Sequence, residues 1–289
     1  MNILLSVGLA ICSVLLTSRA YSFSEADLEK LLNTQACRHC DLRNVVLEDI
    51  DLSDVNLEGA RLDGASLVNV NLDNATLVDM SLQFASLQNI STTNAFWVRV
   101  STIGTDFHGI DFTNSLISSI DFSSARLSDV VLKGVVFDDV ILREQNLSET
   151  NLSGSWISNS DLSNANLQGS DLTEVRFSES NLAYINLQGA TLDDSSFHFI
   201  FSMEDANMRN TSLSGAYLNT VNLRRADLRF AQLSNAHLMR VDLTNAILEG
   251  AIVQGSNLAT AIDELNVLLE GAVWIDGNIC EDKQCSNAH

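Results

Sequence analysis

Two pairs of cysteines are the residues whose type and spacing point most directly to chemistry. Cys37 and Cys40 enclose an Arg-His dipeptide, and Cys280 and Cys285 lie near the end of the chain. A C-x-x-C motif occurs in thiol oxidoreductases, where it begins a helix that follows a strand. Here the motif follows a predicted helix instead, so the sequence favours a structural disulfide within each pair over thiol exchange.

The same residues offer two incomplete sets of metal ligands. One set is Cys37, His39 and Cys40, and the other is Cys280, Cys285 and His289. A structural zinc site needs four ligands, and the repeats between the two sets would hold them too far apart to share one ion. The sequence therefore predicts no metal site and no cofactor.

No set of residues with the pattern of a catalytic site stands out. His108, His198 and His237 are scattered, and the many aspartates at second positions of the repeat, such as Asp51 and Asp161, are imposed by the repeat itself. A regularly spaced carboxylate carries no sign of the paired environments that acid–base catalysis needs. We expect the protein not to be an enzyme.

The element that holds these residues is a repeat of five. Six blocks run without a gap from Val221 to Gly250, each with a small or β-branched residue first, a mostly polar one second and leucine third. Third positions recur every five residues from Leu42 to Phe197 and from Met208 to Leu258, and 41 of these 43 are apolar. Neither a helix, with period 3.6, nor a strand, with period 2, has this spacing. The sequence therefore predicts a repeat architecture.

The repeat resembles the pentapeptide-repeat family, whose blocks read A(D/N)Lxx. Blocks 226–230 and 165–169 match that pattern directly. The resemblance implies an all-β fold, a right-handed quadrilateral parallel β-helix with four blocks per coil and the first and third residues pointing inward. About 11 coils stacked at about 4.8 Å would form a rod of roughly 50 Å. One column of that rod should hold the residues spaced by 20: Phe137, Ile157, Phe177 and Phe197.

A one-residue slip interrupts the repeat between Phe197 and Met208. The added residue must bulge outward, because the neighbouring coils fix the inward positions, and Phe199, Phe201 and Met203 cannot all point inward. One interpretation is an outward aromatic patch of Phe199 and Phe201 that binds a partner. The other, favoured by the usual burial of aromatic rings, is a bulge folded over one face.

A basic stretch follows the slip in an otherwise acidic chain. The sequence has 37 acids against 16 bases, a formal charge of −21, whereas residues 205–240 contain five arginines and two aspartates. The five are Arg209, Arg224, Arg225, Arg229 and Arg240. They could form a docking patch for an acidic partner or for the protein's own acidic face. Local balancing of charge on a solvated wall is the equally weighted alternative.

Both ends of the repeat need a cap, because a solenoid exposes strand edges that invite aggregation. Residues 21–39 are predicted to form a helical cap that begins at Ser24, with residues 40–260 as the β-helix and residues 261–289 as a cap with a cysteine-containing tail. Helical spacing is predicted for Ile262, Leu265, Leu268 and Leu269.

Residues 1–20 have the composition of a secretory signal peptide. An apolar run from Ile3 to Thr17 precedes Ser18-Arg19-Ala20, a small-x-small site, so we expect cleavage after Ala20 and loss of Cys12. The expected location is the periplasm, the thylakoid lumen or the extracellular space. The strong negative charge disfavours nucleic acid and anionic membranes as partners.

Three functions are consistent with these features. The leading hypothesis is a non-catalytic, exported scaffold that presents acidic walls to a protein partner of unknown identity, with a homo-oligomer also possible. The second is DNA mimicry, because some pentapeptide-repeat proteins resemble an acidic duplex and bind DNA gyrase. A cytoplasmic target of this kind conflicts with the predicted signal peptide. The third is a C-x-x-C thiol oxidoreductase.

Overall fold

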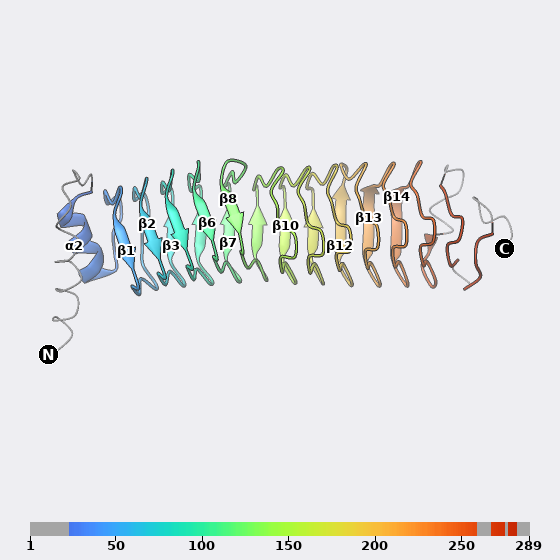
Figure 1. The fold of residues 1–289 in the computed structure, drawn as a ribbon, viewed down its shortest axis with the longest axis horizontal. Coiled ribbons are helices and arrows are strands. Elements are labelled where there is room, and N and C mark those ends of the chain that lie inside the picture. Colours follow the sequence, from blue (N-terminus) through green and yellow to red (C-terminus); the bar gives the residue numbers. More distant parts are fainter. Residues whose placement is uncertain (1–22, 259–266, 275–276, 282–289) are drawn as a thin grey trace.

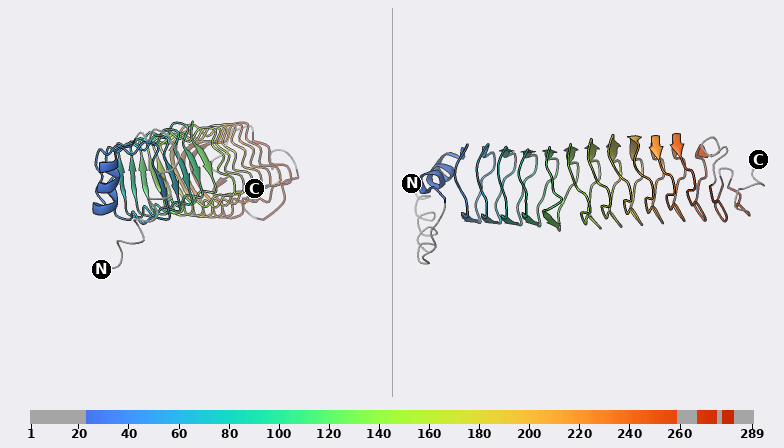
Figure 2. Two further views of the ribbon diagram at one scale, coloured as in Figure 1. Left: turned by 60° about the vertical axis from the view of Figure 1, so that its left-hand side comes forward. Right: turned by 90° about the horizontal axis from the view of Figure 1, so that it is seen from above.

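A computed structural model describes residues 23–258, 267–274 and 277–281. The described chain winds into a rod of stacked coils, about ten turns long, with a helix at its N-terminal end (Figures 1 and 2). Neighbouring coils pair in parallel. From the first coil to the pairing of Ser178 with His198, the partners are 20 positions apart, as in Leu47 with Leu67 and Phe177 with Phe197. The predicted fold, a parallel β-solenoid with four blocks per coil, is confirmed.

Two walls of the rod carry regular strands. The five-stranded sheet contains β1 (Val46–Glu48), β2 (Ser66–Val68), β4 (Ser86–Gln88), β6 (Asp106–His108) and β8 (Arg126–Ser128). The nine-stranded sheet contains β3 (Thr76–Val78), β5 (Phe96–Val98), β7 (Leu116–Ser118), β9 (Val136–Asp138), β10 (Trp156–Ser158), β11 (Arg176–Ser178), β12 (Ser196–Ile200), β13 (Tyr217–Asn222) and β14 (His237–Asp242). The remaining walls are joined by isolated parallel bridges, such as Asn71 with Ser91.

The core is the stack of third-position side chains. The predicted column exists, because the register pairs Phe137 with Ile157, Ile157 with Phe177 and Phe177 with Phe197, and all four are buried. The rings of Phe177 and Phe197 stack with centroids 5.1 Å apart. No single coil could exclude water from these side chains, so the interior is stabilised by contacts between neighbouring coils.

Two polar third positions, Thr92 and Thr102, are also buried. The Thr92 hydroxyl donates to the carbonyl of Asp111 at 3.1 Å, and the Thr102 hydroxyl donates to that of Asp121 at 2.6 Å. Their small size leaves room for a neighbouring cluster of interior rings, which consists of Trp97, Phe107, Phe112 and Phe122. Threonine is therefore compatible with the core where its hydroxyl reaches a backbone carbonyl of the next coil.

The five-stranded sheet ends at β8, where Gln145 enters the ladder. Between Cys40 and Ser256, Gln145 is the only amide side chain at a first position of the repeat. Its Nε2 donates to the carbonyls of Phe122 at 3.0 Å and Ala125 at 3.3 Å. In the next coil the corresponding backbone bond runs from Asn166 to the Gln145 carbonyl at 2.9 Å. The side chain of Gln145 thus replaces one rung of the backbone ladder.

The N-terminal cap is helix α2 (Glu25–Thr34). Ser24 is its N-cap and accepts from the backbone N–H of Asp27 at 3.2 Å, while Leu31 is buried against the first coil. The solenoid path begins earlier than the predicted residue 40, because Ala36 already pairs in parallel with Asn56. Cys37 occupies a buried third position there, in a block that lacks the leucine typical of the repeat.

The predicted C-terminal helix is wrong at Leu268 and Leu269. Leu268 pairs in parallel with Ile247, and Leu269 is buried as a third-position residue, so the coils extend past residue 260. Ile262 and Leu265 lie outside the described residues. The offset from Ile247 to Leu268 is 21 residues rather than 20. This one-residue shift interrupts the five-residue period, and the apolar residues that follow it were therefore predicted to be helical.

The last described coil is covered by a turn of the chain. Val273 pairs antiparallel with Ile279, and the backbone N–H of Cys280 donates to the carbonyl of Ala272 at 2.8 Å. The returning segment satisfies backbone groups that a solenoid edge would otherwise present to another chain. This cap is therefore a strand pairing rather than a helix.

Candidate functional site

The register slip places one added residue in the wall that follows β12. Ile200 and Met203 are both buried, with Phe201 and Ser202 between them, whereas other blocks have a single residue at this point. Ser202 pairs with Asn181 of the preceding coil, so Phe201 is the added residue. Met203 resumes the third-position column, and the coil-to-coil offset is 20 again by the pairing of Asn207 with Asp227.

The two phenylalanines of the slip lie on the outside of the rod. Phe199 is 44% exposed and Phe201 is 65% exposed, and their ring centroids are 6.3 Å apart. The expectation of a bulge folded over one face is therefore wrong, and the rings form an outward pair. The buried positions of Ile200 and Met203 leave no inward site for them. The Asn222 amide, which donates to the carbonyl of Phe201 at 3.1 Å, holds the bulge to the next coil.

Three further rings, those of His198, Tyr217 and His237, form a separate row on the nine-stranded sheet. Tyr217 lies 5.4 Å from His198 and 6.4 Å from His237 between ring centroids. The Tyr217 hydroxyl contacts the sulfur of Met239 at 2.9 Å. The histidines are far apart in the sequence, so we expected them to be scattered. His198 and His237 come close to Tyr217 because β12, β13 and β14 are neighbours in the sheet, and β12 pairs with β13 at an offset of 21 residues.

The arginines of the basic stretch are mostly paired with aspartates of the same chain. Arg225 binds the carboxylate of Asp205 through two hydrogen bonds of 2.8 and 2.6 Å. These bonds lower the pKa of Asp205 and raise the pKa of Arg225. Burial disfavours the charged form of Asp227, but hydrogen bonds and charge from Arg229 outweigh it and lower the pKa of that carboxyl.

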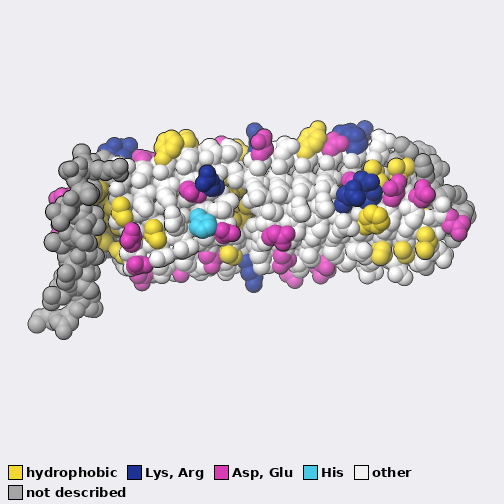
Figure 3. Space-filling model, in the orientation of Figure 1, with side chains coloured by type: hydrophobic (Ala, Val, Ile, Leu, Met, Phe, Trp, Pro, Cys, Tyr) yellow, Lys and Arg dark blue, Asp and Glu magenta, His cyan; other side chains and the backbone are white. Residues whose placement is uncertain are grey.

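The remaining arginines do not complete a single patch. Arg209 lies 3.7 Å from the Asp227 carboxylate, and Arg224 lies 3.5 Å from Asp242. Arg240 is exposed in β14, and no ion pair found among the described residues includes it. Figure 3 shows basic side chains with acidic ones beside them over the C-terminal third of the rod. This pairing favours local balancing of charge over a free basic docking patch.

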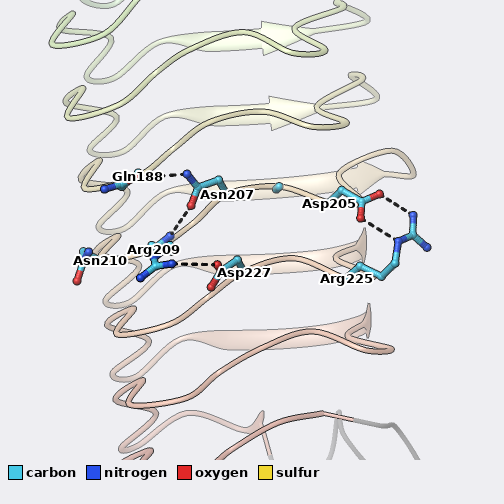
Figure 4. A pocket seen from close by; sticks show the side chains of 8 residues that line it. Gln188, Asp205, Asn207, Arg209, Asn210, Arg225 and Asp227 are labelled. Carbon is cyan, nitrogen blue, oxygen red and sulfur yellow. Dashed lines mark hydrogen bonds and ion pairs between the residues drawn. The ribbon is translucent and has the colours of Figure 1, made fainter.

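A shallow polar groove of about 430 Å³ lies between these pairs. Figure 4 shows Arg209 directed toward Asp227 on one side and Arg225 toward Asp205 on the other. The groove also includes Gln188, Ala206, Asn207 and Asn210. Because the pKa values of both carboxyls are lowered, they are charged at neutral pH and cannot act as general acids there. The groove offers hydrogen-bonding groups but no acid–base pair.

Cys37 and Cys40 form a disulfide with Cα atoms 5.3 Å apart, and both residues are buried. The Cys37 sulfur lies 3.2 Å from the carbonyl oxygen of Asp27 in helix α2. Thiol exchange requires a sulfur that a reactant can reach, which this position does not provide. His39 is exposed and its ring lies over Gly59, so it does not join the two cysteines as a ligand.

Of the two C-terminal cysteines, only Cys280 lies within the described residues. Cys280 is buried and disulfide-bonded, whereas its predicted partner Cys285, and His289, lie outside the described residues, as does the predicted signal peptide. Across the described ranges, no group of three or more His, Cys, Asp or Glu side chains could hold a metal ion. None of the helices in those ranges has the length and hydropathy of a membrane span.

Comparison with known proteins gives a family match. The family model "Pentapeptide repeats" matches in eight copies, over residues 37–79, 125–164, 160–198, 202–238 and 222–259. No curated protein sequence matches the chain.

Solved structures with this fold share little sequence with the chain. HetL of Nostoc sp. PCC 7120, involved in heterocyst differentiation regulation, is 22% identical over 87% of this chain and 97% of its own, with a TM-score of 0.29. QnrB1, a plasmid-mediated fluoroquinolone resistance protein, is 16% identical over 77% and 96%, with a TM-score of 0.34. A protein of the Arabidopsis thaliana thylakoid lumen is 19% identical over 48% and 86%, with a TM-score of 0.24.

Proposed function

Because this chain belongs to the pentapeptide repeat family, we propose that it is a non-catalytic, exported scaffold that binds a partner protein on its outer walls. Stacked side chains fill the interior, so recognition must use outward positions. The observation that carries the proposal is the exposed pair Phe199 and Phe201. Phe201 is the added residue and Phe199 occupies the neighbouring outward corner, so neither ring fills the interior of the coils.

The free energy available at this pair is substantial. Fully burying a phenylalanine side chain stabilises a complex by about 1.5–3 kcal/mol, and these two rings retain roughly half of that exposure. A partner that covers both would gain about 2–3 kcal/mol from them, which is the size of an interface hot spot. Tyr217 and Met239 lie on the adjoining wall, in the column of strands that contains β12, and would enlarge the contact of a partner that spans the corner.

Site-specific photocrosslinking in the native host tests the proposed contact. A photoreactive residue at Phe201 should capture a discrete partner, while one at Phe84, which is 70% exposed on another part of the rod, should not. The double variant Phe199→Ser/Phe201→Ser should lose that partner. Equal capture from Phe201 and Phe84 would contradict a specific site.

The basic stretch has a separate test. If its arginines formed the docking patch, Arg225→Glu/Arg229→Glu would abolish capture at Phe201. Because both guanidiniums already bind aspartates of the chain, we expect capture to persist. Loss of capture with an intact fold would move the site to the arginines.

Export is the second part of the proposal, and it rests on the apolar run and cleavage site of residues 1–20. Sequencing the N-terminus of the mature protein tests it. A chain that begins at Tyr21 supports export and contradicts a gyrase-binding DNA mimic, whose target is cytoplasmic. A cytosolic chain that begins at Met1 would refute export and favour the mimic.

A further inference from the structure

A row of apolar side chains runs along the outside of the nine-stranded sheet. The register pairs Phe96 with Leu116, Leu116 with Val136, and Val136 with Trp156. Paired residues of parallel strands point to the same side of a sheet, so the four side chains form one line, here called the outer stripe. Phe96 is 51% exposed and Trp156 52%, and the two residues between them are half-buried.

The outer stripe is nearly free of charge although the chain carries a formal charge of −21. Its strands β5, β7, β9 and β10, with the adjoining β3, contain one charged residue, Asp138. The corner residues that precede these strands are uncharged and are Asn74, Asn94, Asn114, Gly134 and Gly154. At the opposite corner Asp79 is paired with Arg99, and Asp139 is charged. Two copies that meet along the outer stripe would therefore bring no like charges together within the stripe itself.

The order of side chains along the outer stripe is close to symmetric, with an aromatic ring at each end and an aliphatic side chain at each inner position. We propose that the outer stripe binds the outer stripe of a second copy, with the two rods antiparallel. A two-fold axis through the midpoint would set Phe96 against Trp156 of the other copy and Leu116 against Val136. Each contact would then be made twice, as a closed dimer requires.

Arg176 selects the antiparallel arrangement over the parallel one. It follows Trp156 in the same column, through the pairing of β10 with β11, and it is exposed. With parallel rods, Arg176 would face itself across the axis, and like charges placed opposite each other are destabilising. With antiparallel rods it faces Thr76, which precedes Phe96 in the column.

The area of the wall sets the expected strength of the dimer. About eight coils would overlap, and at about 4.8 Å per coil and a wall about 12 Å wide each copy would bury roughly 450 Å². The total of about 900 Å² lies below the usual range for stable complexes. We therefore expect a weak dimer, with a dissociation constant of about 10–100 µM.

Sedimentation equilibrium of the full chain tests the proposal. The wild-type chain should dimerise, and Trp156→Thr should raise the dissociation constant at least about tenfold, because the lost ring contributes to both halves of the interface. Phe84→Asn removes an exposed ring that lies off the outer stripe and should leave the constant unchanged. A monomer at about 0.5 mM, or equal weakening by the two variants, would overturn the proposal.

A mixing experiment tests the register. Leu116→Lys and Val136→Glu, each on a separate chain, should both be monomeric because each buries an unpaired charge. Mixed together they should form a heterodimer, since the introduced lysine of one chain then faces the introduced glutamate of the other. Failure of the mixture to associate would overturn the antiparallel pairing. Phe199→Ser/Phe201→Ser should still dimerise, which separates this result from the fate of the proposed partner site.

Discussion

Deletion of Phe201 should restore the five-residue period at little cost in stability. Without it, Ile200 and Met203 would again be separated by one residue, as Val221 and Leu223 are in the following coil. Both buried side chains can then keep their places while Ser202 keeps its pairing with Asn181. The coil would shorten from 21 residues to 20, the length of its neighbours.

The expected cost follows from what Phe201 contacts. Its side chain is 65% exposed, so the lost burial is about a third of a full phenylalanine, or about 0.5–1 kcal/mol. The ring contact with Phe199 adds about 0.5–1 kcal/mol. The Asn222 amide loses the Phe201 carbonyl but also contacts Glu204 at 3.2 Å. We expect the free energy of unfolding to fall by about 1–2 kcal/mol in total.

Deletion of Asn181 is the matched control, because it removes the residue that pairs with Ser202 one coil earlier. Ser180 and Leu182 would become adjacent, and adjacent strand residues point to opposite sides. One of two buried side chains must then leave the core, and losing Leu182 alone costs about 2–5 kcal/mol. Urea unfolding followed by circular dichroism compares the two deletions. Equal losses would refute the assignment of Phe201 as the added residue.

Three further changes test other parts of the structure by urea unfolding. Removing the N-terminal disulfide with Cys37→Ala should destabilise the cap by up to about 2 kcal/mol, and an unchanged midpoint would contradict its role. Arg225→Gln should destabilise the rod at neutral pH. Because Arg225 lowers the pKa of Asp205, this stabilisation is present above the ordinary value of 3.8 and is lost as pH falls through the folded-state pKa, so wild type and variant should converge in acid. Gln145→Ala should raise the midpoint by letting the backbone ladder close at Ala125, and a lower midpoint would show that the two amide hydrogen bonds outweigh it.

The repeat could be predicted from the sequence wherever a third position is apolar and the spacing is five. Its ends could not. Cys37 and Trp274 occupy buried third positions although neither is leucine. An added residue before Leu268 breaks the five-residue period, so the sequence there predicted a helix instead of a coil. A period is a local property of the sequence, whereas the place of an added residue depends on which side chains the neighbouring coils hold inside.

The candidate sites depended even more on three-dimensional contacts. The five arginines form a basic stretch in the sequence, but three of their contacts join different coils and arise only in the stack. These are Arg209 with Asp227, Arg224 with Asp242 and Arg225 with Asp205. The sequence does not predict the outer stripe, because its members are 20 residues apart at positions where the repeat accepts almost any residue.

The sequence by itself determined the fold, since a period of five sustained over most of the chain can bury its apolar residues only by stacking coils. The tertiary structure decided what the surface offers. An inward position is restricted by every coil around it, so its chemistry can be read from the repeat. The neighbours of an outward position are set by the stacking of the coils. The exposed rings of Phe199 and Phe201, the inter-coil arginine pairs and the outer stripe could therefore be found only in the tertiary structure.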